Sequence, residues 1–130
     1  MKVVFVSNIL ISAVVFAGGR AETALVRIVN EQDELILSKA ILDETLSVLA
    51  RKFARDAEEI ARIAVYLSGL STNVRPRRQL EVLKDAPDNR VLECAVAGRA
   101  EAVVTGDKAM LALGEYGGIR ILSLRDYLDR

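Results

Sequence analysis

Short apolar runs alternate with segments of helical spacing along nearly the whole chain, and this alternation limits the possible folds more than any other feature. The runs with the length and composition of buried strands are residues 3–6, 35–37, 72–74, 102–104 and 119–122. The segments that predict helices are residues 9–16, 23–31, 38–53, 56–69, 88–98, 108–113 and the end of the chain from residue 123. Strands that alternate with helices favour parallel pairing, because each helix returns the chain to the same end of the sheet. We therefore predict one domain over residues 1–130, a three-layer α/β/α Rossmann-like fold with a mostly parallel central sheet.

The composition supports such a sheet and excludes several kinds of chemistry. Hydrophobic residues make up 52% of the chain and aromatic residues only 5%, so we expect a core of Val, Leu, Ile and Ala. There is no His, which excludes His-based catalysis and most zinc sites. Lys and Arg together number 18, as do Asp and Glu, so nucleic acid would have to bind at a local basic patch.

Cysteine usage and the N-terminal segment both indicate a cytoplasmic protein. Cys94 is the only cysteine, so no internal disulfide forms, and we expect its side chain to pack on a helix face. Residues 2–19 have the outline of a signal peptide. Ser7, Asn8 and Ser12 interrupt its apolar stretch, and its removal would delete the first strand, so we expect it to stay in the domain. No apolar segment reaches about 20 residues, the length of a membrane span, so we expect no membrane partner.

Acidic side chains lie where predicted helices border the expected binding edge of the sheet. Asp85 and Asp88 come before and at the start of one helix, and Asp107 follows the strand at 102–104. Ligands bind beyond the carboxyl ends of strands in such sheets, and gathered carboxylates repel one another unless a divalent cation lies between them. Taken singly, each Asp is better explained as a helix cap. Glu44 is in the middle of a predicted helix. An ordinary, partly exposed Glu with no role at a site would give the same sequence pattern.

Four sequence blocks, in this order, resemble the PIN-domain family over nearly the whole chain. They are NILISA at 8–13, SKAILDE at 38–44, DAPDNRVLECA at 85–95, and VVTGDK at 103–108, which is followed by LGEYGGI at 113–119. The family comprises metal-dependent ribonucleases and includes the VapC-type toxins of toxin–antitoxin systems, and the blocks are most similar to its small standalone prokaryotic branch. The resemblance implies RNA as the substrate, an antitoxin protein as a partner and a homodimer. Ile60, Ile63 and Leu67 would contribute apolar surface to that dimer.

The resemblance also implies roles for individual residues. Glu44, Asp88 and Asp107 match the family's metal-binding acids and would hold Mg²⁺ or Mn²⁺ as the catalytic set. The ion would orient water for in-line attack on an RNA phosphodiester and would stabilise charge on the phosphate. Asp85 would act beyond the direct ligands, and Thr105 would orient ligands or water.

The residues after the first strand depart from the family pattern, because Val6-Ser7-Asn8 stands where the family normally has Asp-Thr-Asn. A hydrocarbon side chain cannot bind a hard cation, and loss of one such group can cost several kcal/mol of transition-state stabilisation. Ser7 is not expected to replace the acid, because adjacent strand residues point to opposite faces. Asn8 would tie this loop to the site or would simply cap a helix that starts at Ile9. We therefore predict weak or absent nuclease activity.

Three explanations for Val6 stay open on the sequence. The protein is a degenerate member retained for binding, or three acids support slow cleavage, or the residue is a substitution selected during cloning. The main alternative function is a non-catalytic PIN scaffold that binds RNA or an antitoxin-like protein. A Rossmann-type nucleotide binder is disfavoured, because no Gly-x-Gly-x-x-Gly turn follows the first strand.

The basic residues divide into two groups. Arg20 and Lys108 lie next to the expected site in the sequence and are the candidates for phosphate contact. Arg75, Arg77 and Arg78 form a basic loop that could contact RNA phosphates, although in a chain of net charge 0 such a loop is better explained as solvated.

Overall fold

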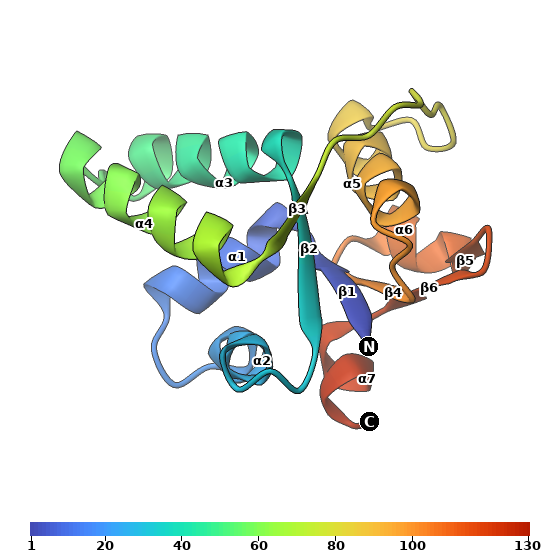
Figure 1. Ribbon diagram of the computed structural model, residues 1–130, viewed down its shortest axis with the longest axis horizontal. Coiled ribbons are helices and arrows are strands. Elements are labelled where there is room, and N and C mark those ends of the chain that lie inside the picture. The colour runs from blue at the N-terminus through green and yellow to red at the C-terminus, as the bar shows by residue number, and fades with distance from the viewer.

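A six-stranded sheet runs through the middle of the protein, whose computed structural model describes residues 1–130 (Figure 1). Its strands are β1 (Lys2–Phe5), β2 (Glu34–Ser38), β3 (Thr72–Val74), β4 (Ala102–Val104), β5 (Glu115–Tyr116) and β6 (Ile119–Leu122). Their spatial order is β3-β2-β1-β4-β6-β5. All neighbours pair in parallel except β5 and β6, which are antiparallel at one edge. This arrangement confirms the predicted α/β fold with a mostly parallel sheet.

Helices cover both faces of the sheet. They are α1 (Ser7–Val15), α2 (Arg20–Val29), α3 (Lys39–Lys52), α4 (Ala57–Leu70), α5 (Ala86–Ala97), α6 (Lys108–Leu113) and α7 (Leu124–Leu128). Figure 1 shows α1 and α2 on one side of the central strands and α5 and α6 on the other, whereas α3 and α4 extend outward as a pair. No single helix has both the length and the apolar composition to cross a membrane, and α1 with α2 passes that test only as a pair bent by 96°.

Side-chain caps fix several of the predicted helix starts. Ser38 Oγ accepts a hydrogen bond from the backbone N–H of Ile41 (3.4 Å) at the start of α3. Asp56 Oδ1 accepts one from Glu59 (2.9 Å) at the start of α4, and Ser123 caps α7 in the same way. Each cap satisfies a backbone donor that has no partner inside the helix, so these starts are readable in the sequence.

Three helices, α5, α2 and α1, begin before the residues that the sequence indicated, and α1 begins at Ser7 rather than Ile9. α5 begins at Ala86 rather than Asp88, because Pro87 is tolerated in a first turn, where its missing N–H is not needed. α2 begins at Arg20 rather than Thr23, directly after a glycine turn. The earlier start of α5 places Asp88 inside the helix and changes its role at the site.

The central strands and the inner faces of the helices form a tightly packed core. Phe5 of β1 is only 1% exposed, and Cys94 of α5 is completely buried, as predicted. Burial raises the pKa of the Cys94 thiol to about 12, so the thiol stays protonated and unreactive. α5 lies so close to β2 that a Cβ added at Gly98 would be 2.3 Å from Ile36 Cγ2.

Polar contacts join α7 to the start of the chain at the amino edge of the sheet. The amino group of Met1 donates to Asp33 Oδ1 (2.7 Å), and the hydroxyl of Tyr127 donates to Asp33 Oδ2 (2.6 Å). Arg27 of α2 donates to the backbone oxygens of Tyr127 (3.0 Å) and Leu128 (2.6 Å), and its guanidinium lies 5.1 Å from the centre of the Tyr127 ring. These contacts hold α7 against α2.

Candidate functional site

The carboxyl ends of β1, β2 and β4 bring four segments together at one edge of the sheet. β1 leads into α1 through Val6, whose backbone N–H donates to the carbonyl of Val104 at the end of β4 (3.2 Å). β2 leads into α3, which carries Glu44, and β4 leads through Thr105 to Asp107. The first turn of α5, a helix that packs against α3, is the fourth segment. The predicted residues therefore meet where parallel sheets bind ligands.

Asp88 is the centre of a group of acidic side chains at this edge. It lies in the first turn of α5 and is half-buried. Burial, followed by the negative charge of Asp107, raises the pKa of Asp88 to about 6. Asp85 and Glu44 contribute further charge of the same sign. The structure thus brings the other three predicted acids within electrostatic reach of Asp88.

Asp107 is both a helix cap and a member of this acidic group. Its Oδ2 accepts a hydrogen bond from the backbone N–H of Met110 (2.9 Å), so the cap explanation is right for this residue. Its own backbone N–H donates to the buried hydroxyl of Thr105 (3.0 Å), which fixes the turn between β4 and α6. One carboxylate oxygen therefore serves the helix, and the other is available to Asp88 or to a ligand.

The cap explanation is wrong for the two aspartates of α5. Asp85 is the N-cap residue, but its side chain makes no cap hydrogen bond, and Asp88 lies inside the first turn. Asn89, to which the sequence assigned no role, holds the preceding loop in place. Its Oδ1 accepts hydrogen bonds from the backbone N–H groups of Val82 (3.0 Å) and Leu83 (2.8 Å). The loop that leads to Asp85 is thereby held against the first turn of α5, which carries Asp88.

Ser7 reaches the site, which corrects the prediction based on strand alternation. Residue 7 begins α1 and is not a strand residue, because β1 ends at Phe5 and Val6 is the N-cap. The same shift shows that Asn8 does not cap the helix. The buried Ser7 hydroxyl donates a hydrogen bond to Glu44 Oε1. Ser7 therefore holds the glutamate in place, although a hydroxyl does not replace the missing charge.

Val6 provides neither a ligand nor a cap. It is 9% exposed and packs with the hydrophobic core, and α1 has no side-chain cap hydrogen bond at this position. Asp is among the best N-cap residues and Val among the poorest. An Asp at this position would therefore suit the start of α1.

Three other predicted residues contribute less to the arrangement. Asn8 is exposed in the first turn of α1. Arg20 begins α2 and Lys108 begins α6, and both are exposed without an ion pair. Only Lys108 adjoins an acid of the site along the chain, so it is the better placed of the two for phosphate contact.

The four acids have the chemistry that a hard divalent cation requires, but they do not form a closed cage. Mg²⁺ and Mn²⁺ prefer carboxylate oxygens, and a cation relieves the repulsion that raises the pKa of Asp88. No three His, Cys, Asp or Glu side chains converge closely enough to hold an ion together. Mg²⁺ usually keeps several waters and takes one or two carboxylates. Asp88 and Asp107 satisfy that smaller requirement as a pair.

Comparison with known proteins decides the family. A family model described as PIN domain matches residues 2–109, a range that includes Glu44, Asp88 and Asp107. The chain belongs to the PIN-domain family. This PIN protein is similar to the uncharacterized protein MJ1680 of Methanocaldococcus jannaschii, with 30% identity over 117 residues that cover 87% of this chain and 75% of that protein.

A solved structure has the same fold. The PIN protein is similar to a chain in the crystal structure of VapBC2 from Rickettsia felis bound to a DNA fragment from their promoter. The TM-score is 0.66 with 11% sequence identity, and the match covers 95% of this chain and 98% of that chain. At this identity the likeness shows a shared fold, and it agrees with the family that the sequence blocks indicated.

Proposed function

We propose that this PIN protein is the toxin component of a toxin–antitoxin system, a metal-dependent endoribonuclease that Val6 attenuates. The observation that carries the proposal is the gathering of Glu44, Asp88 and Asp107 from different elements at the carboxyl edge of the sheet. Membership of the PIN family supports nuclease chemistry. The likeness to a chain of VapBC2 supports the toxin–antitoxin assignment.

In the proposed mechanism, Asp88 and Asp107 would hold Mg²⁺ or Mn²⁺, and Ser7 restrains Glu44 through its hydrogen bond. A bound metal would supply an activated water and would stabilise charge on the scissile phosphate. Thr105 keeps Asp107 in position by accepting the hydrogen bond from its backbone N–H. The protein residues thus contribute mainly orientation and negative charge, which is the usual division of work at such sites.

A hollow between α3 and α5 adjoins these acids and provides space for part of an RNA strand. Its volume is about 260 Å³, and it is lined by Ala40, Ile41, Glu44, Ala86, Pro87, Arg90 and Val91. Arg90 is held at its wall by hydrogen bonds to Glu93 Oε2 (2.6 Å) and to the backbone oxygen of Leu80 (3.3 Å). Because Glu44 belongs to both the hollow and the acidic group, we propose that the strand reaches the metal from this side.

Val6 is the reason that we propose attenuated rather than full activity. Removal of one preorganised electrostatic group from an active site typically lowers kcat by about 10²–10³. Val6 lies at the N-cap of α1, beside the end of β4, where an added carboxylate would join the other acids. Restoring that carboxylate is therefore the direct test of the catalytic assignment.

The test is cleavage of single-stranded RNA in Mn²⁺. We expect Val6→Asp to raise the cleavage rate at least about tenfold, because it returns a charged group to the metal site. Val6→Asn is the matched control: it can also cap α1 but adds no charge, so its rate should remain that of the unchanged chain. Asp88→Asn should abolish the gain in the Val6→Asp background. Equal rates for Val6→Asp and Val6→Asn would show that the catalytic assignment is wrong.

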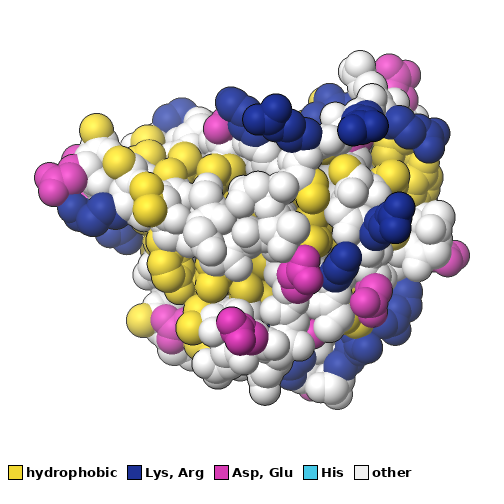
Figure 2. All heavy atoms as spheres, in the orientation of Figure 1, with side chains coloured by type: hydrophobic (Ala, Val, Ile, Leu, Met, Phe, Trp, Pro, Cys, Tyr) yellow, Lys and Arg dark blue, Asp and Glu magenta, His cyan; other side chains and the backbone are white.

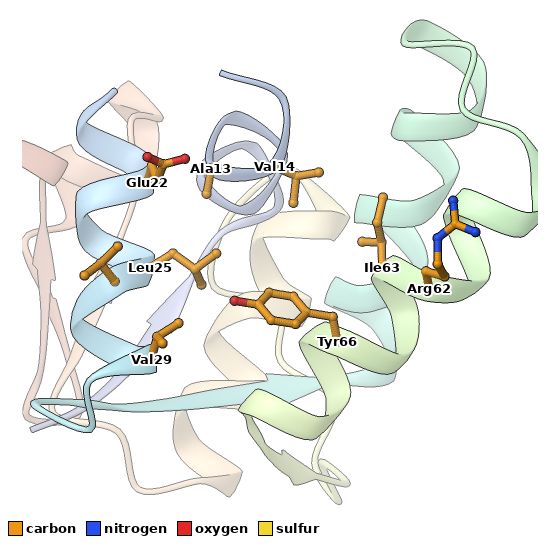
Figure 3. A pocket seen from close by; sticks show the side chains of 9 residues that line it. Ala13, Val14, Glu22, Leu25, Val29, Arg62, Ile63 and Tyr66 are labelled. Atoms are coloured by element: carbon orange, nitrogen blue, oxygen red, sulfur yellow. The ribbon is translucent and has the colours of Figure 1, made fainter. Parts of the chain in front are cut away.

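An apolar groove supports a protein partner, both for the toxin and for the alternative of a purely binding PIN scaffold. The groove lies between α1, α2 and α4 and has a volume of about 480 Å³ (Figure 3). It is lined by Ala13, Val14, Glu22, Leu25, Val26, Val29, Arg62, Ile63 and Tyr66. Figure 3 shows Glu22 on α2 and Arg62 on α4, on opposite sides of the apolar residues. We propose that an amphipathic helix of an antitoxin-like protein binds here.

The predicted homodimer surface needs one correction. Leu67 is completely buried inside the protein and cannot contact a second copy, and Ile63 lines the groove. The outward apolar residue of α4 that lies outside the groove is Val65, which is 74% exposed. We propose that a homodimer uses the outer face of α4 and that the antitoxin uses the groove.

Two single substitutions separate these surfaces. Val65→Glu should convert a dimer into a monomer in light scattering. It should leave binding of the candidate antitoxin, the protein encoded by the gene beside this one, unchanged. Val29→Glu, at a groove residue that is 48% exposed, should abolish that binding and leave the dimer intact. If Val29→Glu instead converts the dimer into a monomer, the groove is the binding site for a second copy of the chain.

A further inference from the structure

Four arginines surround a cleft that lies outside the proposed cleavage site. Arg75, Arg77 and Arg78 are on the segment that follows β3, and Arg99 directly follows the C-cap of α5. The cleft has a volume of about 670 Å³, and the rest of its lining is Val74, Pro76, Leu80, Glu93, Val96 and Ala97. Figure 2 shows Lys and Arg side chains gathered along the upper edge of one face, over the region between β3 and α5. Residues distant in the sequence therefore form one basic surface, which we call the arginine cleft.

Protein carboxylates do not balance the charge of the arginine cleft. None of its four arginines forms an ion pair, and all four are exposed. The single acid of the lining, Glu93, is buried and already accepts hydrogen bonds from Arg90 (2.6 Å) and from the backbone N–H of Leu80 (2.8 Å). Guanidinium groups remain charged at any physiological pH. A chain of net charge 0 thus concentrates four unpaired positive charges in one cleft.

The backbone on both sides of the arginine cleft is fixed. On one side, Leu80 is buried and its N–H is bound to the carboxylate of Glu93. On the other side, Arg99 has a φ of +52°, a left-handed conformation that favours glycine at helix ends. Its N–H donates to the carbonyl of Val96 (3.2 Å), which holds this conformation. The side chain of Arg99 therefore leaves the end of α5 from a fixed position at the wall of the cleft.

We propose that the arginine cleft binds the phosphate groups of single-stranded RNA. The planar guanidinium fork matches phosphate oxygens and binds them in pairs of hydrogen bonds. The lining contains no aromatic side chain on which a base could stack, so the contacts are to the backbone and are independent of base sequence. The proposal rests on the proposed function in one respect, because it takes RNA as the substrate.

α5 connects the arginine cleft with the acidic group. Asp88 lies in its first turn and Arg99 lies just beyond its last turn. At a rise of about 1.5 Å per residue, the two positions are roughly 16 Å apart along the helix. A strand that follows α5 would therefore have one phosphate at the carboxylates while the arginines hold phosphates further along. The cleft would supply affinity, and the acids would supply chemistry.

Binding of a fluorescein-labelled single-stranded RNA, measured by anisotropy in EDTA to prevent cleavage, tests the proposal. A variant with Gln in place of Arg75, Arg77 and Arg78 should bind at least about tenfold more weakly at low salt. Each phosphate contact on a single strand contributes about 0.7 to the slope of log K against log salt concentration. Loss of three contacts should therefore reduce that slope by roughly 2. An unchanged slope would overturn the proposal.

A charge-matched control separates a specific cleft from general attraction. Gln in place of Arg51, Arg120 and Arg125 removes the same charge from exposed positions outside the cleft. We expect this control to change RNA affinity less than about threefold, because these side chains do not converge on one cavity. If the control weakens binding as much as the cleft variant does, the proposal is wrong.

Arg99→Gly separates RNA binding from folding. Glycine adopts a φ of +52° without strain, so the melting temperature should rise while RNA affinity falls. If the melting temperature rises and RNA affinity is unchanged, Arg99 does not contribute to RNA binding, and the assignment of all four arginines to the binding site is wrong.

The cleft and the catalytic proposal fail in different ways. If RNA binding depends on the cleft arginines but the Val6→Asp variant does not cleave RNA, the proposal of RNA binding by the cleft is supported and the proposed nuclease activity is wrong. If the Val6→Asp variant cleaves RNA but RNA binding does not depend on the cleft arginines, only the proposal of RNA binding by the cleft is wrong.

Discussion

Asp88 is the carboxylate whose pKa the fold raises, from 3.8 to about 6. Its partial burial comes first among the causes, and the neighbouring acids add to it. Because the pKa in the folded state is above the unfolded value, protonated Asp88 contributes stability that is fully present below about pH 4. This contribution is lost as the pH rises through 6. At neutral pH the repulsion between the acids therefore lowers the stability of the fold. A bound cation would relieve this repulsion.

Asp88→Asn should stabilise the protein at pH 8 and leave it nearly unchanged at pH 4. One pKa unit corresponds to about 1.4 kcal/mol, and solvent screening at a half-buried side chain reduces the effect, so we expect a gain of about 1 kcal/mol at pH 8. Urea unfolding in EDTA at the two pH values measures it. Glu115→Gln, at an exposed acid of β5 without an ion pair, is the control and should show no such difference between the two pH values. Equal gains at both pH values would contradict the electrostatic explanation.

The sequence blocks indicated Glu44, Asp88 and Asp107 as candidates, and the fold brings them to one edge of the sheet, but two residues that position this group were not predicted. Ser7 was expected on a strand, and the end of β1 at Phe5 turned its side chain toward the glutamate. Asn89 has backbone groups of a loop as its partners, and no periodic pattern reveals such contacts. Residue types and order therefore indicated the chemistry, whereas positioning depended on element boundaries that sequence patterns locate poorly.

Among the elements, α5 connects the largest number of functional parts. It presents Asp88 at its start, buries Cys94 in its middle and ends beside Arg99. Its position depends on β2, because Gly98 at its end lies directly against Ile36. A shift of this helix would move the acidic group and the arginine cleft together.

Gly98→Ala should destabilise the protein by about 1–3 kcal/mol, because the new Cβ would overlap a side chain in a packed core. The overlap is with Ile36 Cγ2, at 2.3 Å. Ile36→Ala removes that atom, so the double variant should lose at least about 0.5 kcal/mol less than the sum of the single losses. Urea unfolding of the four proteins measures the difference. Gly69→Ala, on α4 with no atom within 4 Å of the new Cβ, should instead stabilise by about 0.5–1 kcal/mol.

At the scale of the whole molecule, the sequence predicted the α/β fold because every long element has its own pattern of apolar residues. β5 was not predicted, because it has only two residues and depends on a turn. In that turn Gly117 and Gly118 have φ angles of 56° and 85°, which glycine adopts readily. The sequence also did not reveal the hydrogen bond that holds α7 in place, because its partners, Asp33 and Tyr127, are far apart in the chain.

Tyr127→Phe should destabilise the folded protein by about 1–2 kcal/mol at pH 7, because Asp33 loses a charge-assisted hydrogen bond. Burial raises the pKa of Asp33, but hydrogen bonds from the Met1 amino group and Tyr127, with nearby positive charge, outweigh it and hold that pKa below 3.8. The stabilisation is therefore present above about pH 4 and is lost as the pH falls further.

Urea unfolding at pH 7 and pH 3 measures this contribution, and the difference in stability between the two proteins should be smaller at the lower pH. Tyr116→Phe, at a half-buried residue whose hydroxyl makes no hydrogen bond, is the control and should change stability by less than about 0.5 kcal/mol. A loss for Tyr127→Phe that does not depend on pH would assign the effect to packing instead.

β3 has a further consequence for the behaviour of the protein at high concentration. It is an edge strand of three residues, and its outer side has no partner within the sheet. Exposed edges allow strands of different molecules to pair into aggregates, and positive charge beside an edge opposes this. Arg75, Arg77 and Arg78 follow β3 directly, so the repulsion between them keeps two such edges apart. The same arginines that we propose hold RNA would thus also keep the free protein dispersed.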